Sequence, residues 1–476
     1  MVSLLILVPF FTLVILNFLF KYPGRRIAFW LGLLFSLAQV ELSLLPGSHF
    51  WSDKAFVLND VFKFIFLVDN LTRLMLLSIG VVMAVGFIVS RHIVEDESKR
   101  SDLFNLFFIL LIGLNGVVLT KDIFSLYVFI EVASITSFIL IAFDKDIHAL
   151  EAAFKYIMLS VLASVLMLSG VGLLILTCGT TDFSGIHSVL AVSSNNFTVF
   201  AVGLFLCGLF IKSGLVPFHT WLPDAYSSAP AHVSILLGGI ITKTAGVYAL
   251  IRVVVTIFGF HDSMKLVLLF IGAFSVILGA LAALTQSDFK RMLAYSSISQ
   301  VGYIILGLGS GTPLGLAGAA LHLFNHSIFK SLLFVNAAAV EKQTGTRNID
   351  KMSGLAQRMP ITGITSVLAS LSAAGLPPLA GFWSKLIIII ALWSAGFRFY
   401  ALIGALAGIL TLAYFLSLQR RAFFGEVPKE LAGVKEAKAG LLIPSIALAG
   451  VIILVGILTP FILKDIILPL GDILGG

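Results

Sequence analysis

The chain has 476 residues, of which 59% are hydrophobic and only 12% are charged, with a formal net charge of +7. Soluble domains are close to half apolar and a quarter charged, so this composition excludes an ordinary soluble protein and indicates a polytopic membrane protein. Its two cysteines, Cys178 and Cys207, form no CxxC pair, which excludes a cysteine-ligated iron–sulfur cluster and argues against a disulfide framework. The positive charge comes with no basic tail and no phosphate-binding glycine loop, so it indicates neither nucleic-acid binding nor ATP chemistry.

Apolar runs of about 18–25 residues predict about fourteen membrane spans. In chain order they cover 2–20, 27–46, 71–90, 103–120, 122–143, 152–177, 199–225, 231–257, 265–284, 292–309, 315–340, 360–395, 399–419 and 441–463. The first run lacks a basic leader and a small-residue cleavage site, so we expect a retained helix rather than a signal peptide.

Two of these spans contain helix-breaking residues and are predicted to be broken. The seventh is interrupted at Gly214 and Pro217, and the twelfth at Pro377 and Pro378. The run 360–395 is too long for one crossing. We prefer one broken helix to two separate crossings because no polar linker divides it.

No extramembrane piece is long enough to form its own core, so we predict a single membrane domain over 1–476. We expect helices 1–3 in 1–100, a first repeat (helices 4–8) in 101–260, a second repeat (helices 9–13) in 261–420 and helix 14 in 421–476. The two breaks lie five helices apart, and an odd number of helices inverts one repeat relative to the other. Most of the 31 lysines and arginines fall in loops on one side, which predicts that both termini lie on the outer face.

Glu131 lies about nine residues into its span, which is near mid-membrane at about 1.5 Å per residue. Acidic residues at this depth are rare, so we favour a titrating carboxylate paired with Lys155 or Lys212 over a merely structural ion pair. Lys155 also has a simpler alternative, since Glu151 is one helical turn away.

Lys212 and Lys243 are predicted near mid-membrane, with His219 and His232 in and after the polar stretch that separates their spans. Broken backbone at that depth survives only inside protein or beside water. Burial disfavours an ammonium and a nearby carboxylate favours it, so a lysine held between these effects changes protonation when its partner moves. Structural snorkelling is the alternative, and we expect it for Arg252, which lies nearer a span end.

His322, His326 and Lys330 recur every four residues and therefore share one helix face. Histidine titrates near neutral pH, so this face predicts a hydrated proton relay, which Lys385 completes after the second break. Chelation of a metal by the two histidines is the alternative. No HExxH glutamate or nearby third ligand supports it, and we predict no metal site.

Across these stretches the chain resembles the antiporter-like ion-translocating subunits shared by respiratory complex I, Mrp-type cation/proton antiporters and membrane-bound hydrogenases. The resemblance rests on FIEVAS at 129–134, KSGLVPFHTWLPDAY at 212–226, APAHVSILL at 229–237, ITKTAGVY at 241–248, DFKRMLAYSSISQVG at 288–302 and GLPPLAGFWSK at 375–385. These motifs span most of the chain, and their order and spacing are highly specific.

The resemblance implies fourteen helices with two inverted five-helix repeats and broken helices 7 and 12. It implies the following proton-handling residues: Glu131 and Lys212 as a coupled acid–lysine pair, Lys243 as the central relay, His322 and His326 as connectors, and Lys385 as the terminal lysine. Some family members have glutamate at the Lys385 position, so lysine indicates the branches that keep a base there. The short carboxyl tail disfavours the largest complex I member and favours an Mrp D-like or hydrogenase-type subunit.

We therefore expect a non-catalytic, ion-translocating subunit of a complex in the cell membrane, driven by redox chemistry or by a counter-ion gradient in partner subunits. Its expected partners are other antiporter-like and small helical subunits, a redox arm, the lipid bilayer and the transported ion, proton or sodium. The chain contains no nucleophile elbow and no dinucleotide fingerprint, so no catalytic centre and no cofactor are expected. A structural membrane scaffold and a stand-alone secondary transporter remain the alternatives.

Overall fold

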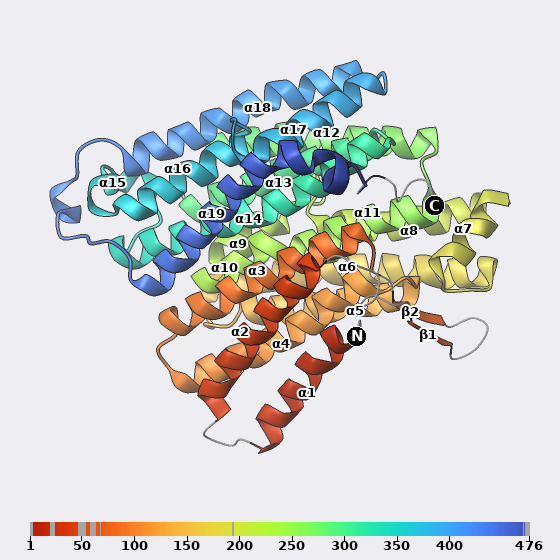
Figure 1. Ribbon diagram of the computed structural model, residues 1–476, viewed down its shortest axis with the longest axis horizontal. Helices are drawn as coiled ribbons and strands as arrows, with labels where there is room; N and C mark the ends of the chain where they lie inside the picture. The colour runs from red at the N-terminus through yellow and green to blue at the C-terminus, as the bar shows by residue number, and fades with distance from the viewer. Residues whose placement is uncertain are drawn as a thin grey trace. The chain divides into compact units, whose positions relative to one another are not determined.

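The computed structural model describes residues 3–19, 24–45, 54–57, 63–66, 68–192, 195–469 and 471. Helices dominate these residues, as predicted (Figure 1). A short antiparallel hairpin, in which β1 (Lys54–Val57) pairs with β2 (Lys63–Phe66), was not predicted. Residues 2, 20 and 46 of the first two predicted spans, and 470 and 472–476 of the carboxyl-terminal segment, lie outside the described residues.

The helices before the first break are α1 (Leu4–Leu19), α2 (Gly24–Leu44), α3 (Asn70–Ile93), α4 (Glu97–Leu119), α5 (Ile123–Ile141), α6 (Ile147–Cys178), α7 (Phe183–Val192) and α8 (Asn196–Ser213). Then come α9 (Trp221–Ser228), α10 (Ala231–Leu236), the π-helical segments η1 (Leu237–Ile241) and η2 (Lys243–Tyr248), α11 (Ala249–Val253) and the π-helical η3 (Val254–Phe258). The rest are α12 (Asp262–Leu284), α13 (Phe289–Gly309), α14 (Pro313–Thr344), η4 (Ile349–Lys351), α15 (Leu355–Arg358), α16 (Pro360–Ala374), α17 (Ala380–Ser394), α18 (Arg398–Leu418), η5 (Gln419–Phe423), η6 (Lys429–Leu431), α19 (Ala439–Ile462) and η7 (Leu463–Ile467).

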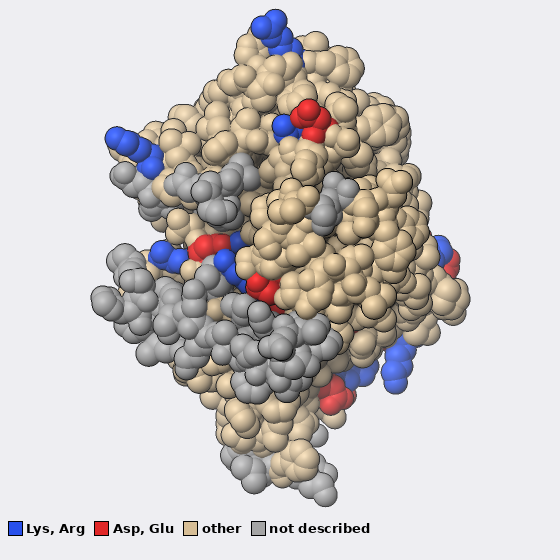
Figure 2. Space-filling model, turned by 90° about the vertical axis from the view of Figure 1, so that its right-hand side faces the viewer, with Lys and Arg blue, Asp and Glu red and all other residues tan. Residues whose placement is uncertain are grey.

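Twelve helices among the described residues are long and apolar enough to cross a membrane. The shorter apolar helices α1 and α16 with α17 supply the other two predicted crossings. Large apolar side chains such as Phe154 and Phe399 are 59% and 70% exposed, as expected where a helix faces lipid. Figure 2 shows a face on which uncharged side chains predominate and charged ones form a few small groups. The chain is a multi-pass membrane protein.

Both predicted helix breaks are confirmed. α8 ends at Ser213, and Gly214 then takes a positive φ of 66° before the chain turns into α9. α16 ends at Ala374, and Gly375 takes a φ of 87° before α17 begins at Ala380. Only glycine adopts this left-handed conformation without steric cost, so each glycine marks the residue at which its helix stops.

The chain divides into two compact units. Unit 1 comprises residues 1–87, 94–214 and 240–261, and unit 2 comprises 88–93, 215–239 and 262–476. In unit 1, α8 packs against α6 and against η2. In unit 2, α9 packs on α13 and α10 packs on α14. The predicted inverted repeats at 101–260 and 261–420 stay a prediction.

The long helix α14 forms the core of unit 2. Its most apolar window is completely buried, and the helix packs against α10, α13, α16, α17 and α19. Thr312 caps its first turn by accepting a hydrogen bond from Gly315 N, and Gly345 ends it with a φ of 69°. A helix buried on every side carries any polar residue into the protein interior, where that residue needs a partner.

Candidate functional site

Lys212 and Glu131 form an ion pair inside unit 1. Lys212 Nζ lies 3.0 Å from Glu131 Oε1, and the two side chains are 2% and 22% exposed. The ammonium also donates hydrogen bonds of 2.8 Å to the hydroxyls of Ser134 and Ser160. Ser164 donates to Glu131 Oε1 over 2.7 Å. Of the two lysines that the sequence offered to Glu131, the structure therefore brings Lys212 to it.

The local sequence explains why this pair lies beside a helix end. Lys212 occupies the last turn of α8, where exposed carbonyl groups favour a cation. Gly246 of η2 packs directly against that end. A Cβ at Gly246 would lie 2.6 Å from Ser213 Cα and 2.7 Å from Lys212 O. Glycine at this position therefore allows two backbones to approach within a distance that no side chain permits.

Lys243 is completely buried in the π-helical segment η2. The segments η1 and η3 are also π-helical, so the helix that carries Lys243 departs repeatedly from regular α-geometry. π-helical turns of this kind are frequent at functional sites, because they shift the register of the side chains that follow. A buried amine here has to be accommodated by the protein or change its protonation state.

His322 and His326 lie on the buried face of α14, as predicted, with parallel rings 6.3 Å apart. His322 Nδ1 is 2.8 Å from the Ser384 hydroxyl, and Asn325 Nδ2 donates to Ala380 O over 2.8 Å. Neither His322 Nε2 nor Asn325 Oδ1 has a hydrogen-bond partner among the described residues. Buried polar atoms are normally bonded to protein or to ordered water, so these two atoms fit a hydrated path.

Lys385 lies immediately after the second break and reaches back to it. Its ammonium donates to the carbonyl of Ala373 over 2.7 Å, in the last turn of α16, and lies 4.3 Å from the ring centroid of Tyr303. Lys385 and Tyr303 also line a cavity of about 330 Å³ between α13, α16, α17 and α18. Lys385 therefore places a cation at the carboxyl end of the half-helix α16.

Three further candidates lie within unit 2. Lys330 continues the buried face of α14, where it donates to Leu293 O over 2.9 Å and contacts the Ser296 hydroxyl. His232 is buried in the first turn of α10, and His219 is half-buried in the turn between α8 and α9. These positions agree with the predicted polar stretch around the first break.

Lys155 lies on a more exposed surface than the other candidates. Its ammonium is 2.8 Å from Glu151 Oε1, one turn earlier on α6, and the two side chains are 47% and 58% exposed. This is the simple surface pair that the sequence allowed as an alternative.

Arg252 contradicts its expected role, because it does not snorkel to a membrane surface. It is 2% exposed and binds both carboxylate oxygens of Asp69, at 2.5 and 2.8 Å, and the hydroxyls of Thr72 and Tyr248. Burial raises the pKa of Asp69, but the Arg252 charge and its hydrogen bonds outweigh burial and hold that pKa well below its usual value. In the sequence, the clue to a buried partner for Arg252 was Asp69, an acidic residue at the start of an apolar helix. Asp69 also caps α3 by accepting a hydrogen bond from Thr72 N.

The metal alternative for the two histidines gains no support from the surrounding side chains. Within the part of the chain that the structure describes, no three His, Cys, Asp or Glu residues gather closely enough to hold an ion. Cys178 and Cys207 are both free.

A multi-pass helical protein with two broken helices, and with bases buried beside the breaks, has the architecture of an ion-transport protein. The comparison with known families is specific: residues 120–411 match the family described as NADH:quinone oxidoreductase/Mrp antiporter, TM. The chain belongs to this family, and the resemblance stated from the sequence motifs is confirmed.

Two relatives represent an antiporter branch and an oxidoreductase branch of the family. The chain is 34% identical over 401 residues to the D-type subunit of the Na(+)/H(+) antiporter of Alkalihalophilus pseudofirmus, covering 83% of this chain and 80% of the relative. It is 33% identical over 385 residues to the N-type subunit of the NADH-quinone oxidoreductase of Desulforudis audaxviator. That match covers 78% of this chain and 76% of the relative.

Solved structures that match come from these two kinds of complex and from the membrane-bound sulfane sulfur reductase, an archaeal respiratory membrane complex. A chain of the Mrp complex from a Dietzia species superposes with a TM-score of 0.91 at 25% identity, covering 99% of this chain and 97% of that one. A chain of respiratory complex I from Thermus thermophilus superposes with a TM-score of 0.86 at 26% identity, and the match covers all of both chains. The chain thus shares its family and fold with subunits of multisubunit membrane complexes.

Proposed function

We propose that this chain is an antiporter-like subunit that translocates protons within a multisubunit membrane complex. The observation that carries the proposal is the ion pair between the buried Lys212 and the partly exposed Glu131, placed where α8 breaks at Gly214. Kinship with sodium/proton antiporter subunits and quinone oxidoreductase subunits supports the same function.

The pair works as a protonation switch. Burial disfavours the ammonium form of a lysine, and a carboxylate at 3.0 Å restores it. If the end of α8 moves so that Lys212 leaves Glu131, the ammonium loses its counter-charge and releases its proton inward. The return of Lys212 to Glu131 favours uptake of the next proton. The break at Gly214 supplies the place at which the helix end can move.

The remaining candidates extend this switch into a relay. Its proposed order is Glu131, Lys212, Lys243, His322 with His326, and Lys385, with His219, His232 and Lys330 as buried accessory groups and Lys155 at its exposed edge. Serine hydroxyls around Lys212 and the polar atoms around His322 fit water-assisted transfer between these groups.

The chain is proposed to act in the plasma membrane with both termini on the outer face, because its loop lysines and arginines then lie inside. The proposed organisation is two inverted repeats, 101–260 and 261–420, flanked by helices 1–3 and helix 14. Its partners are other antiporter-like and small helical subunits. A sodium gradient drives it in the antiporter branch, and a redox arm drives it in the oxidoreductase branch.

The test is proton transport by the assembled complex in closed vesicles. Lys212→Met and Glu131→Gln should each abolish coupled proton movement while the complex still assembles. Lys265→Met is the matched control, because Lys265 pairs with the 94% exposed Asp262 at 3.2 Å on a helix end. Near-normal transport by Lys212→Met in a correctly assembled complex contradicts the proposal.

A further inference from the structure

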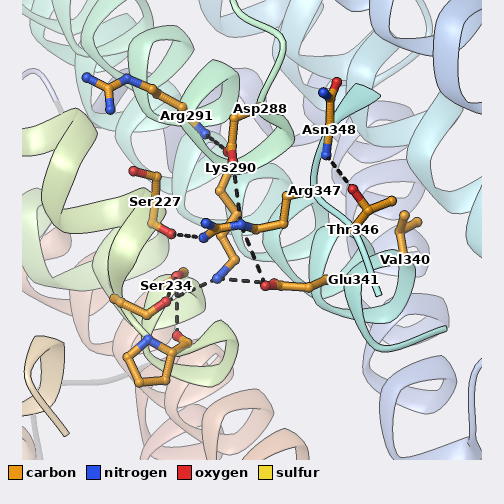
Figure 3. A network of polar contacts seen from close by, with 12 residues as sticks. Ser227, Ser234, Asp288, Lys290, Arg291, Val340, Glu341, Thr346, Arg347 and Asn348 are labelled. Carbon is orange, nitrogen blue, oxygen red and sulfur yellow. Dashed lines mark hydrogen bonds and ion pairs between the residues drawn. The ribbon is translucent and has the colours of Figure 1, made fainter. Parts of the chain in front are cut away.

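Unit 2 carries a cluster of charges that the relay does not use, and Figure 3 labels its members other than Asp224. Its acidic members are Asp224, Asp288 and Glu341, and its basic members are Lys290, Arg291 and Arg347. The cluster joins α9, the first turn of α13, the last turns of α14 and the loop that follows α14. Equal numbers of acids and bases balance its charge.

Lys290 is the buried member of this cluster. Its side chain is 3% exposed, and its ammonium lies 3.2 Å from Glu341 Oε2. It also donates to the carbonyl of Ala229 over 3.0 Å. Ala229 and Pro230 separate α9 from α10, so Lys290 binds the chain where its helical hydrogen bonds are interrupted.

The arginines hold the outer part of the cluster in place. Arg347 Nη1 donates to Ser227 O over 2.5 Å, and its Nε lies 3.4 Å from Asp288 and 3.7 Å from Glu341. Arg291 pairs with Asp224 at 2.9 Å. The loop after α14 and the start of α13 are thereby tied to α9.

Glu341 and Lys290 pair a partly exposed side chain with a buried one. The Glu341 side chain is 33% exposed, whereas that of Lys290 is 3% exposed. His232 is 2% exposed and lies in the first turn of α10, three residues after the Ala229 carbonyl that Lys290 binds. A partly exposed carboxylate, a buried amine and a buried imidazole therefore lie around the junction of α9 and α10.

We propose that Glu341 and Lys290 are the proton-uptake site of unit 2, a role that rests on the proposed function. Lys290 passes a proton from its ammonium to the imidazole of His232 and becomes a neutral amine. Glu341, protonated from water, then passes its proton to that amine and returns to a carboxylate. In the proposed topology this site opens on the inner face of the membrane.

The residue types favour proton transfer over a purely structural lock. A guanidinium stays charged in proteins, whereas an amine changes protonation readily when it is buried. The cluster has arginine at its two partly exposed basic positions, Arg291 and Arg347, which are 41% and 38% exposed. It has lysine only at the buried position. A cluster that only held the helix ends together would work equally well with arginine at all three basic positions.

The experiment compares Glu341→Gln, Glu341→Asp and Asp350→Asn in the assembled complex, with proton transport in vesicles recorded against pH and in heavy water. Asp350 is the control, because it pairs with Arg421 near the same loop and is 57% exposed. We expect Glu341→Gln to slow transport at least tenfold and Glu341→Asp to restore part of the rate with a shifted pH profile. Asp350→Asn should behave as the wild type.

A wild-type rate and pH profile for Glu341→Gln overturns the proposal. If Glu341→Gln does not assemble, Glu341→Asp tests the proposal instead. An unchanged transport rate and pH profile for Glu341→Asp overturns the proposal. A slower rate with a shifted pH profile supports it. Lys212→Met, measured in parallel, separates the two claims. Loss of transport there with normal transport in Glu341→Gln leaves the relay standing without this uptake site, and normal transport in both contradicts the relay itself.

Discussion

Lys212 and Glu131 lie on different helices, α8 and α5, yet their charged atoms are 3.0 Å apart and the lysine side chain is 2% exposed. Two hydroxyls, from Ser134 and Ser160, complete the surroundings of the ammonium. An ammonium bonded to two hydroxyls as well as to its counter-ion can change partner without leaving the protein interior. This arrangement supports a switch, and it makes the two serines the first residues to test.

Replacing Ser160 with alanine should slow proton transport severalfold without loss of the assembled complex. The lysine would lose one hydrogen bond, worth about 1 kcal/mol or somewhat more for a charged donor, and a hydroxyl beside the transferred proton. Transport per assembled complex measures the effect. Thr136→Val is the control, since the Thr136 hydroxyl bonds only to Val132 O in its own helix. Equal rates for the two variants would argue against a role for Ser160.

Gly246→Ala should strongly reduce both the amount of folded protein and its transport. The new Cβ would lie 2.6 Å from Ser213 Cα, and a backbone atom cannot yield as a flexible side chain does. Gly203 of α8 provides the control, because a Cβ there meets nothing within 4 Å. Immunoblotting of membranes and vesicle transport should show Gly203→Ala unchanged. A Gly246→Ala variant with normal amount and rate would contradict the close approach.

Asp69 and Arg252 are predicted to stabilise unit 1 rather than to carry protons. Asp69→Asn leaves a buried guanidinium without its counter-charge, a change that typically costs about 3–5 kcal/mol. Thermal unfolding in detergent should show a lower unfolding temperature for Asp69→Asn. The separate variant Arg252→Lys should also lower it, because lysine cannot bind both carboxylate oxygens as the guanidinium does. Transport per assembled complex should stay near that of the wild type; a complete loss of transport in assembled complexes would place the pair in the relay.

The same pair predicts a pH dependence with a definite sign. The folded-state pKa of Asp69 lies below its unfolded value, so the contribution of the pair is complete above the unfolded pKa, which is about 3.9. It is lost only as pH falls from there through the folded pKa. Wild-type unfolding temperature should therefore lose its excess over Asp69→Asn only below about pH 4. Convergence of the two curves near pH 6 would contradict the low pKa of Asp69.

Lys385 tests whether the structure around it accepts only lysine or also the glutamate that some family members have at this position. Its ammonium caps the carboxyl end of α16 at Ala373 O, the negative end of the helix dipole. A carboxylate there would face the same carbonyl groups without a donor. We therefore expect Lys385→Glu to transport as poorly as Lys385→Met, at least tenfold below the wild type, although some family members have glutamate at this position. A Lys385→Glu complex with near-normal vesicle transport would contradict this explanation.

Local signals in the sequence were enough to predict the long apolar helices and both helix breaks. Gly214 and Pro217, and Gly375 with the prolines after it, interrupt apolar runs and mark the breaks that the structure shows. The ten-residue helix α7 was missed because it is shorter than any window that detects membrane spans. The π-helical turns around Lys243 were missed because hydropathy does not distinguish an i→i+5 hydrogen bond from an i→i+4 one.

Pairings between distant residues were much harder to predict. The position of Glu131 along its span predicted a mid-membrane carboxylate but did not choose between Lys155 and Lys212, because that choice depends on how α5, α6 and α8 pack. The partners Asp69 and Arg252 are 183 residues apart, and no local pattern connects them. Charged residues near span ends therefore look interfacial in sequence even when tertiary packing buries them.

The double variant Glu131→Gln with Lys212→Met tests the central claim most directly, in comparison with each single variant. Removing one charge leaves the other buried without a counter-ion, whereas removing both restores a neutral interior. Assembly and proton transport of the complex should be measured on the same vesicles. We predict that the double variant assembles at least as well as either single variant and still transports no protons. Recovery of transport together with assembly would contradict the relay and show that the pair serves only the packing of helices.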